Sequence, residues 1–313
     1  SSSSTPTPTP VANTVISGLV VAGPVVAGNG LKAIAYDPKD GHTLGEGTLN
    51  ADGSFSIDLG VYSGPVLVRV TDTNADPDYF DEATGAAKDM TADLRAMTYA
   101  PGGGTIKVNV NVFTEVAVKV LENGSKLDGN QFSGTAQDIT DANNKVAASL
   151  GLAQNLVTGD APVAVVNADG SANNSANAYG KLLAAASGLD ENSSTEQSLQ
   201  ALLDAVNSTE AMAKLMLEGF AKTLDETTLK FSLDLNTVTY MINGIQKAID
   251  SLNQQVSSNS AEINDLVDKY AELKLALDTL DGIVNGDADT EGTVNYRIAE
   301  LETALGSALD AAV

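Results

Sequence analysis

The sequence predicts a multidomain α+β protein with an N-terminal antiparallel β-sandwich, a middle helical bundle and a C-terminal coiled coil or helical hairpin. Three observations lead to this prediction. Short runs rich in β-branched residues alternate with Gly, Pro and Asn turns up to about residue 120. Runs rich in Ala and Leu with helical spacing follow, and a heptad repeat begins near residue 238. We therefore divide the chain into residues 1–12, 13–120, 121–237 and 238–313.

The composition excludes several classes of function. The 313 residues include 41 Asp and Glu against 17 Lys and Arg, a net charge of −24, so the surface repels nucleic acid phosphates. One His and no Cys exclude thiol nucleophiles, disulfides and zinc sites built from Cys and His. The sequence contains no phosphate-binding glycine loop, no serine-hydrolase elbow and no apolar run long enough to span a membrane. We expect no enzyme, no catalytic residue, no nucleic acid partner and no transmembrane segment.

Residues 1–12 form a Ser/Thr/Pro-rich leader, and its first ten residues, SSSSTPTPTP, offer no side chains with which to build a core. We expect a flexible spacer here. The Ser-rich start resembles the stretch that follows the lipidated Cys of bacterial lipoproteins, and this resemblance implies a lipid anchor upstream of residue 1. An acidic chain without Cys is also typical of a mature extracytoplasmic bacterial protein, so we expect an extracellular or cell-surface location.

Residues 13–120 contain closely spaced strand-like runs, which predict a β-sandwich. The runs 55–59 and 66–70 each place alternate apolar residues on one face. The segments ISGLVVAGPVVAGNGLKAIAYD, DGSFSIDLG and GPVLVRVTD resemble the transthyretin-like, or carboxypeptidase-regulatory-like, Ig-type sandwiches of bacterial surface proteins and lipoproteins. The later YFDEATG, LRA and VNVFTEVAVK are similar to the way such a sandwich passes into a helical region. The resemblance implies an Ig-like fold and a surface location, and it brings no catalytic residues.

One acidic stretch has the oxygen ligands that calcium prefers, at a spacing of about two residues. Its candidate metal ligands are Asp72, Asn74, Asp76, Asp78, Asp81 and Glu82. The match to an EF-hand loop is poor, because Pro77 stands where the sharp turn needs Gly and Ala83 stands where a bidentate Glu belongs. The alternative is a solvated acidic loop. Calcium is therefore the one ion for which the sequence offers ligands, and we expect no other cofactor.

Residues 121–237 contain four runs with helical spacing, at 139–152, 176–189, 198–206 and 210–224. Gly151 and Gly188 mark the expected ends of the first two. The apolar positions of the last run recur at threes and fours, which predicts a buried stripe. These positions are Met212, Leu215, Met216, Phe220 and Leu224.

Residues 238–313 carry a heptad repeat that continues without a slip from Ile242 to Val284. The candidate oligomerisation residues at its a and d positions are Ile242, Ile245, Ile249, Leu252, Val256, Asn259, Ile263, Leu266, Tyr270, Leu273, Leu277 and Leu280. A wide apolar seam favours three or more strands, and Asn259 resembles the buried Asn layers of trimeric autotransporter stalks. The segment GDADTEGTVNYRIAELETAL resembles a recurring part of bacterial and phage fibre proteins. The alternative is a hairpin within one chain, with its turn at residues 285–292.

This order of segments is typical of an extended surface protein. We expect an extracellular structural protein of a bacterial cell surface that self-associates as a filament or S-layer-type subunit, or as an adhesin stalk. In such an assembly the apolar residues 11–22 could supply a strand to a neighbouring molecule. One alternative is an outer-surface lipoprotein that binds carbohydrate or a calcium-linked ligand, and another is a phage or bacterial fibre component.

Overall fold

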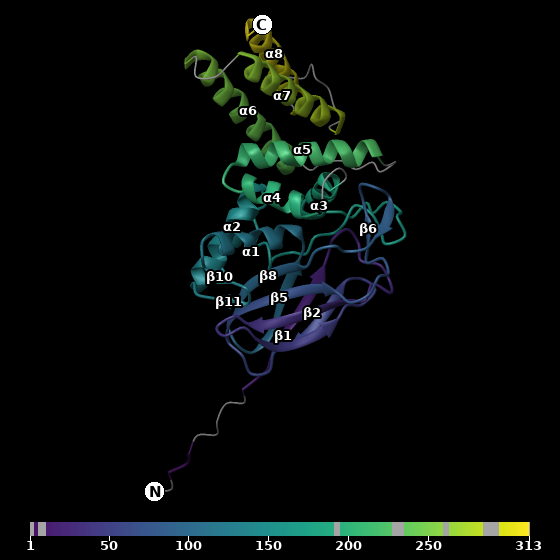
Figure 1. Cartoon of the computed structure of the whole chain (residues 1–313), viewed down its shortest axis with the longest axis vertical. Helices are drawn as coiled ribbons and strands as arrows, with labels where there is room; N and C mark the ends of the chain where they lie inside the picture. The colour runs from purple at the N-terminus through teal and green to yellow at the C-terminus, as the bar shows by residue number, and fades with distance from the viewer. Residues whose placement is uncertain are drawn as a thin grey trace.

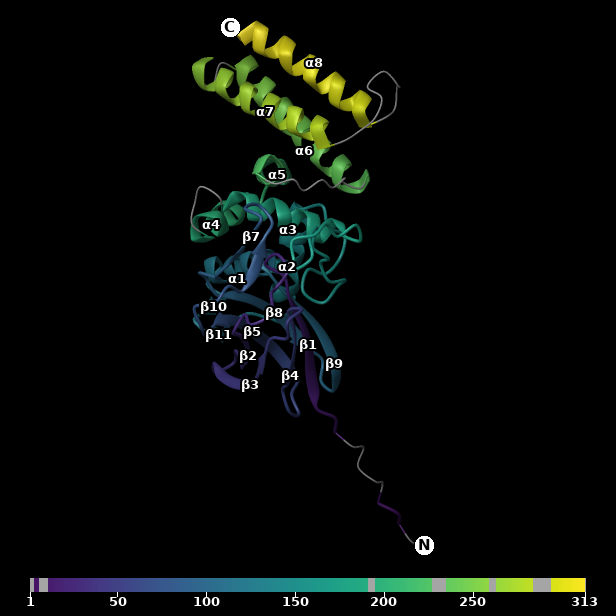
Figure 2. The same cartoon turned by 90° about the vertical axis from the view of Figure 1, so that its right-hand side faces the viewer.

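A computed structural model describes residues 3–5, 11–190, 195–226, 235–258, 263–283 and 294–312. Most of the predicted leader, residues 1–2 and 6–10, lies outside this part of the chain. The protein is an α+β structure in which the sheets occupy one end and the helices are stacked toward the other (Figure 1). The N-terminal residues leave from the end of the sheets that faces away from the helices (Figure 2).

Two sheets form the N-terminal part. The first has the strand order β3-β2-β5-β8, with β2 (Leu31–Asp37), β3 (His42–Thr48), β5 (Gly64–Asp72) and β8 (Leu94–Ala100). The second has the order β4-β1-β9, with β1 (Thr14–Val20), β4 (Ser54–Asp58) and β9 (Gly104–Val110). Both enclose one apolar core, to which Ile57 of β4 and Val68 of β5 contribute fully buried side chains. The predicted alternation of apolar residues in these two strands is confirmed.

The structure differs from the expectations for this part in three respects. The strands are not all antiparallel, because β1 runs parallel to β9, with Ile16 opposite Ile106. In addition, β1 pairs with both β4 and β9 of its own chain, so it is not a free strand that a neighbour could accept. The helical part also begins earlier than residue 121, since α1 (Val112–Asn123) starts two residues after β9 ends. Asn111 begins this helix by accepting the backbone N–H groups of Phe113 and Thr114.

Helices cover the outer face of the four-stranded sheet. Leu67 of β5 and Met97 of β8 point away from the core between the sheets and pack against Val118 and Leu121 of α1. The same apolar cluster includes α2 (Ala136–Ser149) and the short hairpin of β10 (Leu127–Asp128) and β11 (Gln131–Phe132). Strands β5 and β8 are therefore covered on both faces, which ties the helical part to the sheet.

The predicted helical runs are confirmed as α2, α3 (Ala178–Leu189), α4 (Thr195–Ala205) and α5 (Thr209–Glu226). Met212, Met216 and Phe220 of α5 are fully buried, as the stripe predicted. Gly151 does follow α2 with a positive φ, whereas Gly188 lies inside α3 and does not end it. A Cβ at Gly188 would lie 2.1 Å from the carbonyl oxygen of Gly219, so this glycine permits the close approach of α3 and α5.

The heptad region folds back on itself, as α6 (Leu235–Ser258), α7 (Ile263–Ile283) and α8 (Val294–Ala312). The hydroxyl of Tyr270 donates to Oδ1 of Asn253 at 2.7 Å. In one continuous helix these residues would lie about 25 Å apart, so the predicted uninterrupted rod is wrong. Arg297 of α8 also donates to Asn243 of α6. The turn expected at residues 285–292 lies outside the described residues.

The candidate oligomerisation residues mostly face the core of their own chain. The positions that are buried there are Ile242, Ile245, Ile249, Leu252, Tyr270, Leu273, Leu277 and Leu280. Val256 is half-buried, and Asn259 and the side chains of Ile263 and Leu266 lie outside the described part of the chain. The apolar seam that suggested a multimer is therefore filled by α5, α6, α7 and α8 of one molecule.

Distance measurements between two spin labels should report the folded-back arrangement. The chain has no native Cys, so Lys247→Cys and Lys274→Cys provide unique labelling sites on exposed positions of α6 and α7. We expect a distance on the order of 20 Å, since packed helix axes lie about 10 Å apart and the labels add their own length. A distance near 40 Å, as in a continuous helix, would contradict the fold described here.

Candidate cation site

The residues that could bind a cation lie at the base of a small hairpin between β5 and β8. The hairpin consists of β6 (Tyr79–Asp81) and β7 (Ala86–Lys88). Its base is closed by the backbone N–H of Asp78, which donates to the carbonyl of Lys88 at 2.8 Å. The N–H of Val26 donates to the carbonyl of Asp78, and this bond holds the base against the segment after β1.

Three carboxylates meet at this base. Asp72 is the last residue of β5, Asp78 directly precedes β6, and Asp89 directly follows β7. One oxygen of each lies within 4.8 Å of an oxygen of the other two. Asp78 is fully buried, Asp72 is half-buried and Asp89 is exposed. The three groups therefore form a small acidic cup, with Asp78 at its floor and Asp89 at its solvent side.

Of the three carboxylates, Asp78 has the strongest physical reason to bind a cation. Its Oδ2 accepts the backbone N–H of Met90 at 2.7 Å, while its Oδ1 has no hydrogen-bond partner among the described residues. Burial raises the pKa of Asp78 to about 7, and the carboxyls of Asp89 and Asp72 add to the shift. Burial also raises the pKa of Asp72. A cation in the cup would neutralise this charge and supply the missing partner of Oδ1.

The structure brings together only part of the predicted ligand set. Asp72 and Asp78 converge, whereas Asn74 and Asp76 are exposed and form turns within their loop. Asp81 does not join this group, because its carboxylate accepts the hydroxyl of Ser187 and pairs with Lys88 at 3.2 Å, so the prediction that it shares this site needs correction. The sequence interpretation also missed Asp89, because it lies beyond the hairpin and only the fold brings it to Asp78.

Glu82 does not belong to the acidic cup either. Its side chain is fully buried, and neither carboxylate oxygen has a hydrogen-bond partner within the described ranges. Burial raises its pKa to about 8, and the adjacent Asp81 adds to this effect. Burial thus favours the protonated form of Glu82, and the structure does not bring this predicted ligand together with Asp72, Asp78 and Asp89.

A second acidic group, Asp37, Asp40 and His42, lies at the turn between β2 and β3. His42 and Asp40 are exposed and bond to each other at 2.5 Å. Asp37 already accepts the backbone N–H of Lys39 and lies 3.9 Å from its ammonium group. Asp40 and His42 thus pair with each other and Asp37 pairs with Lys39, so these carboxylates already have partners that Oδ1 of Asp78 lacks among the described residues.

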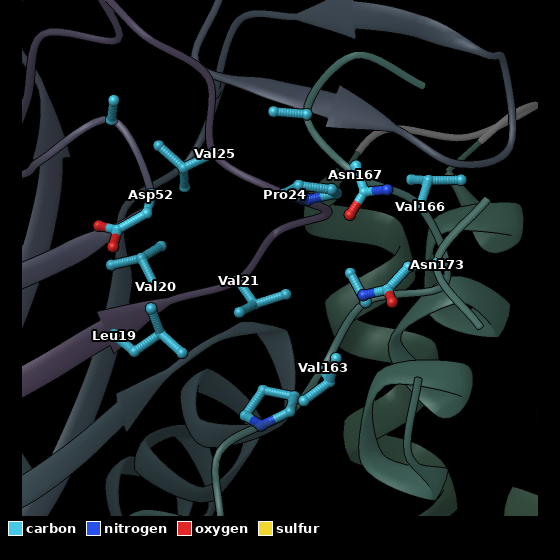
Figure 3. A pocket seen from close by; sticks show the side chains of 14 residues that line it. Leu19, Val20, Val21, Pro24, Val25, Asp52, Val163, Val166, Asn167 and Asn173 are labelled. Carbon is cyan, nitrogen blue, oxygen red and sulfur yellow. The ribbon is translucent and has the colours of Figure 1, made fainter. Parts of the chain in front are cut away.

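An apolar groove of about 440 Å³ lies where the end of β1 meets the segment 162–173. Figure 3 shows Val20, Val21 and Val25 on one side and Val163 and Val166 on the other. Polar groups enter only at Asp52, Asn167 and Asn173. The groove can accept an apolar group, but its lining offers no pair of titratable side chains for acid–base chemistry.

No protein-family model, curated protein or solved structure matches this chain. None of the helices in the described part of the chain is both long enough and apolar enough to cross a lipid bilayer. The acidic cup therefore has to be interpreted from its own geometry.

Proposed function

We propose that this protein is a non-catalytic binding module of a bacterial cell surface and that its acidic cup binds Ca²⁺. The observation that carries the proposal is the convergence of Asp72 and Asp89 on Asp78, a fully buried carboxylate with an unpartnered oxygen. Burying such a charge without a partner is costly, and a bound cation removes that cost.

The ligand chemistry favours calcium over the common transition metals. The cup offers carboxylate oxygens and neither His nor Cys, so it suits a hard cation. The three carboxylates come from a strand end, a loop and the residue after a second strand, which is an irregular arrangement. Ca²⁺ accepts irregular geometry and variable numbers of ligands, whereas Mg²⁺ requires a near-octahedral shell and retains its waters.

The surface role extends the resemblance to Ig-type sandwiches of bacterial surface proteins. Two sheets around one core, an acidic surface and a Cys-free chain support that assignment. Binding is favoured over self-assembly because the heptad side chains that suggested a multimer are mostly buried within one chain. The proposal therefore adopts the binding-module alternative, with calcium as the first ligand.

Calcium binding should be visible by terbium luminescence. The chain has no Trp, so Tyr79, next to Asp78, can act as the sensitiser of a bound Tb³⁺ ion. We expect a luminescence signal on excitation of tyrosine that Ca²⁺ removes by competition. Tyr79→Phe should reduce the signal without changing the calcium affinity measured by calorimetry.

Asp78→Asn should abolish binding of both ions, and Asp76→Asn is the matched control because Asp76 is exposed and lies outside the cup. With a Kd of 10⁻⁴–10⁻³ M, typical of extracellular modules, about 10 mM Ca²⁺ should stabilise the wild type by roughly 1–3 kcal/mol. Asp78→Asn should fold normally and show no such increase. Equal calcium responses of the two variants would overturn the proposal.

A further inference from the structure

The hairpin that carries the acidic cup also connects the sheets to the helices. Figures 1 and 2 show β6 and β7 rising from the sheets beside α3. At its base lie Asp78 and Asp89, and on its other side lie residues that contact α3 and the segment 165–170. The same short element therefore joins the proposed cation site to the helical part of the protein.

The polar part of this connection is centred on Ser187 of α3. Its hydroxyl donates to Oδ1 of Asp81 at 2.5 Å and accepts the backbone N–H of Ala83 at 3.4 Å. All three residues are buried. Asp81 also pairs with Lys88 across the hairpin, so the group that contacts α3 is held by both strands.

The apolar part of the connection is made by Phe80. It packs against Val165, Val166 and Ala184, which form a separate small apolar cluster. Gly170 faces its ring so closely that a Cβ there would lie 2.9 Å from the ring. Phe80 thus fixes the segment 165–170 and α3 relative to the hairpin.

The hairpin is too short to be stable by itself. Each of its strands has three residues, and isolated two-stranded hairpins are at best marginally stable in water. Asp78 and Asp89 lie at the two ends of the hairpin, where β6 begins and β7 ends. Negative charge on both carboxyl groups would push these two ends apart, whereas a shared cation attracts both.

We propose that Ca²⁺ in the cup of Asp72, Asp78 and Asp89 acts as a latch that closes the base of the β6–β7 hairpin and so stabilises its contacts with Ser187 of α3 and with the segment 165–170. This inference rests on the proposed function, since it assigns a regulatory role to the same cation site. Calcium then controls how firmly the hairpin is attached to α3 and to the segment 165–170, through the contacts of Asp81 with Ser187 and of Phe80 with Val165 and Val166.

Hydrogen exchange of the full-length protein, followed by mass spectrometry with and without Ca²⁺, tests the latch. At a Ca²⁺ concentration tenfold above the measured Kd, we expect exchange of residues 79–90 to slow about tenfold. Exchange should also slow, by roughly threefold or more, in the segment 165–170 and at the end of α3 near Ser187. Slowing confined to residues 72–90, in a protein that binds Ca²⁺, would overturn the latch and leave the cation site intact.

Ser187→Ala distinguishes binding of the cation from its effect on α3. Ser187 lies outside the cup, so the variant should retain terbium luminescence and the calcium-dependent protection of residues 79–90. It should lose most of the calcium-dependent protection at the end of α3, because the bonds to Asp81 and Ala83 are absent. Unchanged protection of α3 in this variant would contradict the assigned connection. Absence of terbium binding in the wild type would instead refute the cation site itself.

Discussion

Arg95→Met is expected to lower the free energy of unfolding by about 3–5 kcal/mol, because it leaves a buried carboxylate without a counter-charge. Arg95 lies on β8 and is only 8% exposed. Its Nε and Nη2 donate to the carboxylate of Glu115 in α1 at 2.6–3.2 Å, and Nη2 also donates to Glu122 at 2.6 Å. Glu115 is 2% exposed, so water cannot replace the lost guanidinium. Urea denaturation followed by circular dichroism measures the effect.

The double variant Arg95→Met/Glu115→Leu is the matched control. It removes both charges and replaces them with apolar side chains, so we expect most of the lost stability to return. Arg95→Lys should lie between the wild type and Arg95→Met, since an ammonium group cannot reproduce the bidentate contact with Glu115. A denaturation midpoint of Arg95→Met equal to that of the wild type would show that the network does not hold α1 against the sheet.

Glu82→Gln is expected to remove a loss of stability that develops in the wild type as the pH rises. The fully buried Glu82 has a pKa near 8 in the folded protein, whereas a free Glu side chain ionises near 4.5. Below pH 4.5 the carboxyl is protonated in both states, so it adds no pH dependence to the stability. Between pH 4.5 and 8 the unfolded chain releases the proton and the folded chain retains it, so stability falls by about 1.4 kcal/mol per pH unit.

Thermal unfolding from pH 4 to pH 9 tests this expectation. The two proteins should have similar stability near pH 4, and the glutamine variant should be the more stable by on the order of 3–5 kcal/mol at pH 9. Glu300→Gln is the control, because Glu300 is exposed on α8 and its replacement should shift the profile little. Parallel profiles of wild type and Glu82→Gln would mean that Glu82 reaches water or a partner in the folded state.

Local structure could be predicted wherever the pattern alone defines one buried face. Alternation in residues 55–59 and 66–70 led to β4 and β5, and the apolar spacing of residues 210–224 led to α5. The repeating side chains are mostly buried, as Ile57, Val68 and Met216 are. Leu67, on the opposite face of β5, is buried as well, because α1 covers that face. The α+β class followed from the order of these runs along the chain.

The heptad repeat did not determine which surface buries its apolar face. A repeat of apolar residues every three or four positions requires that one helix face be buried, but it does not say by which partner. The same Tyr270 can face a neighbouring molecule in a rod or Asn253 of its own chain in a folded-back pair. The choice depends on whether α6 and α7 continue as one helix or fold back against each other, and the heptad pattern is the same in both cases.

By itself, the sequence determined that a strand-rich part precedes a helical part, which faces of several of these elements are buried, and that Asp72 and Asp78 lie in one acidic stretch. Only the tertiary structure decided that Asp89 joins these two residues, that Asp81 turns toward Ser187 and that Arg95 meets Glu115. The physical reason is that periodicity records which side of an element avoids water. The pairing of charges depends on distances between elements, and these are set only when the elements pack.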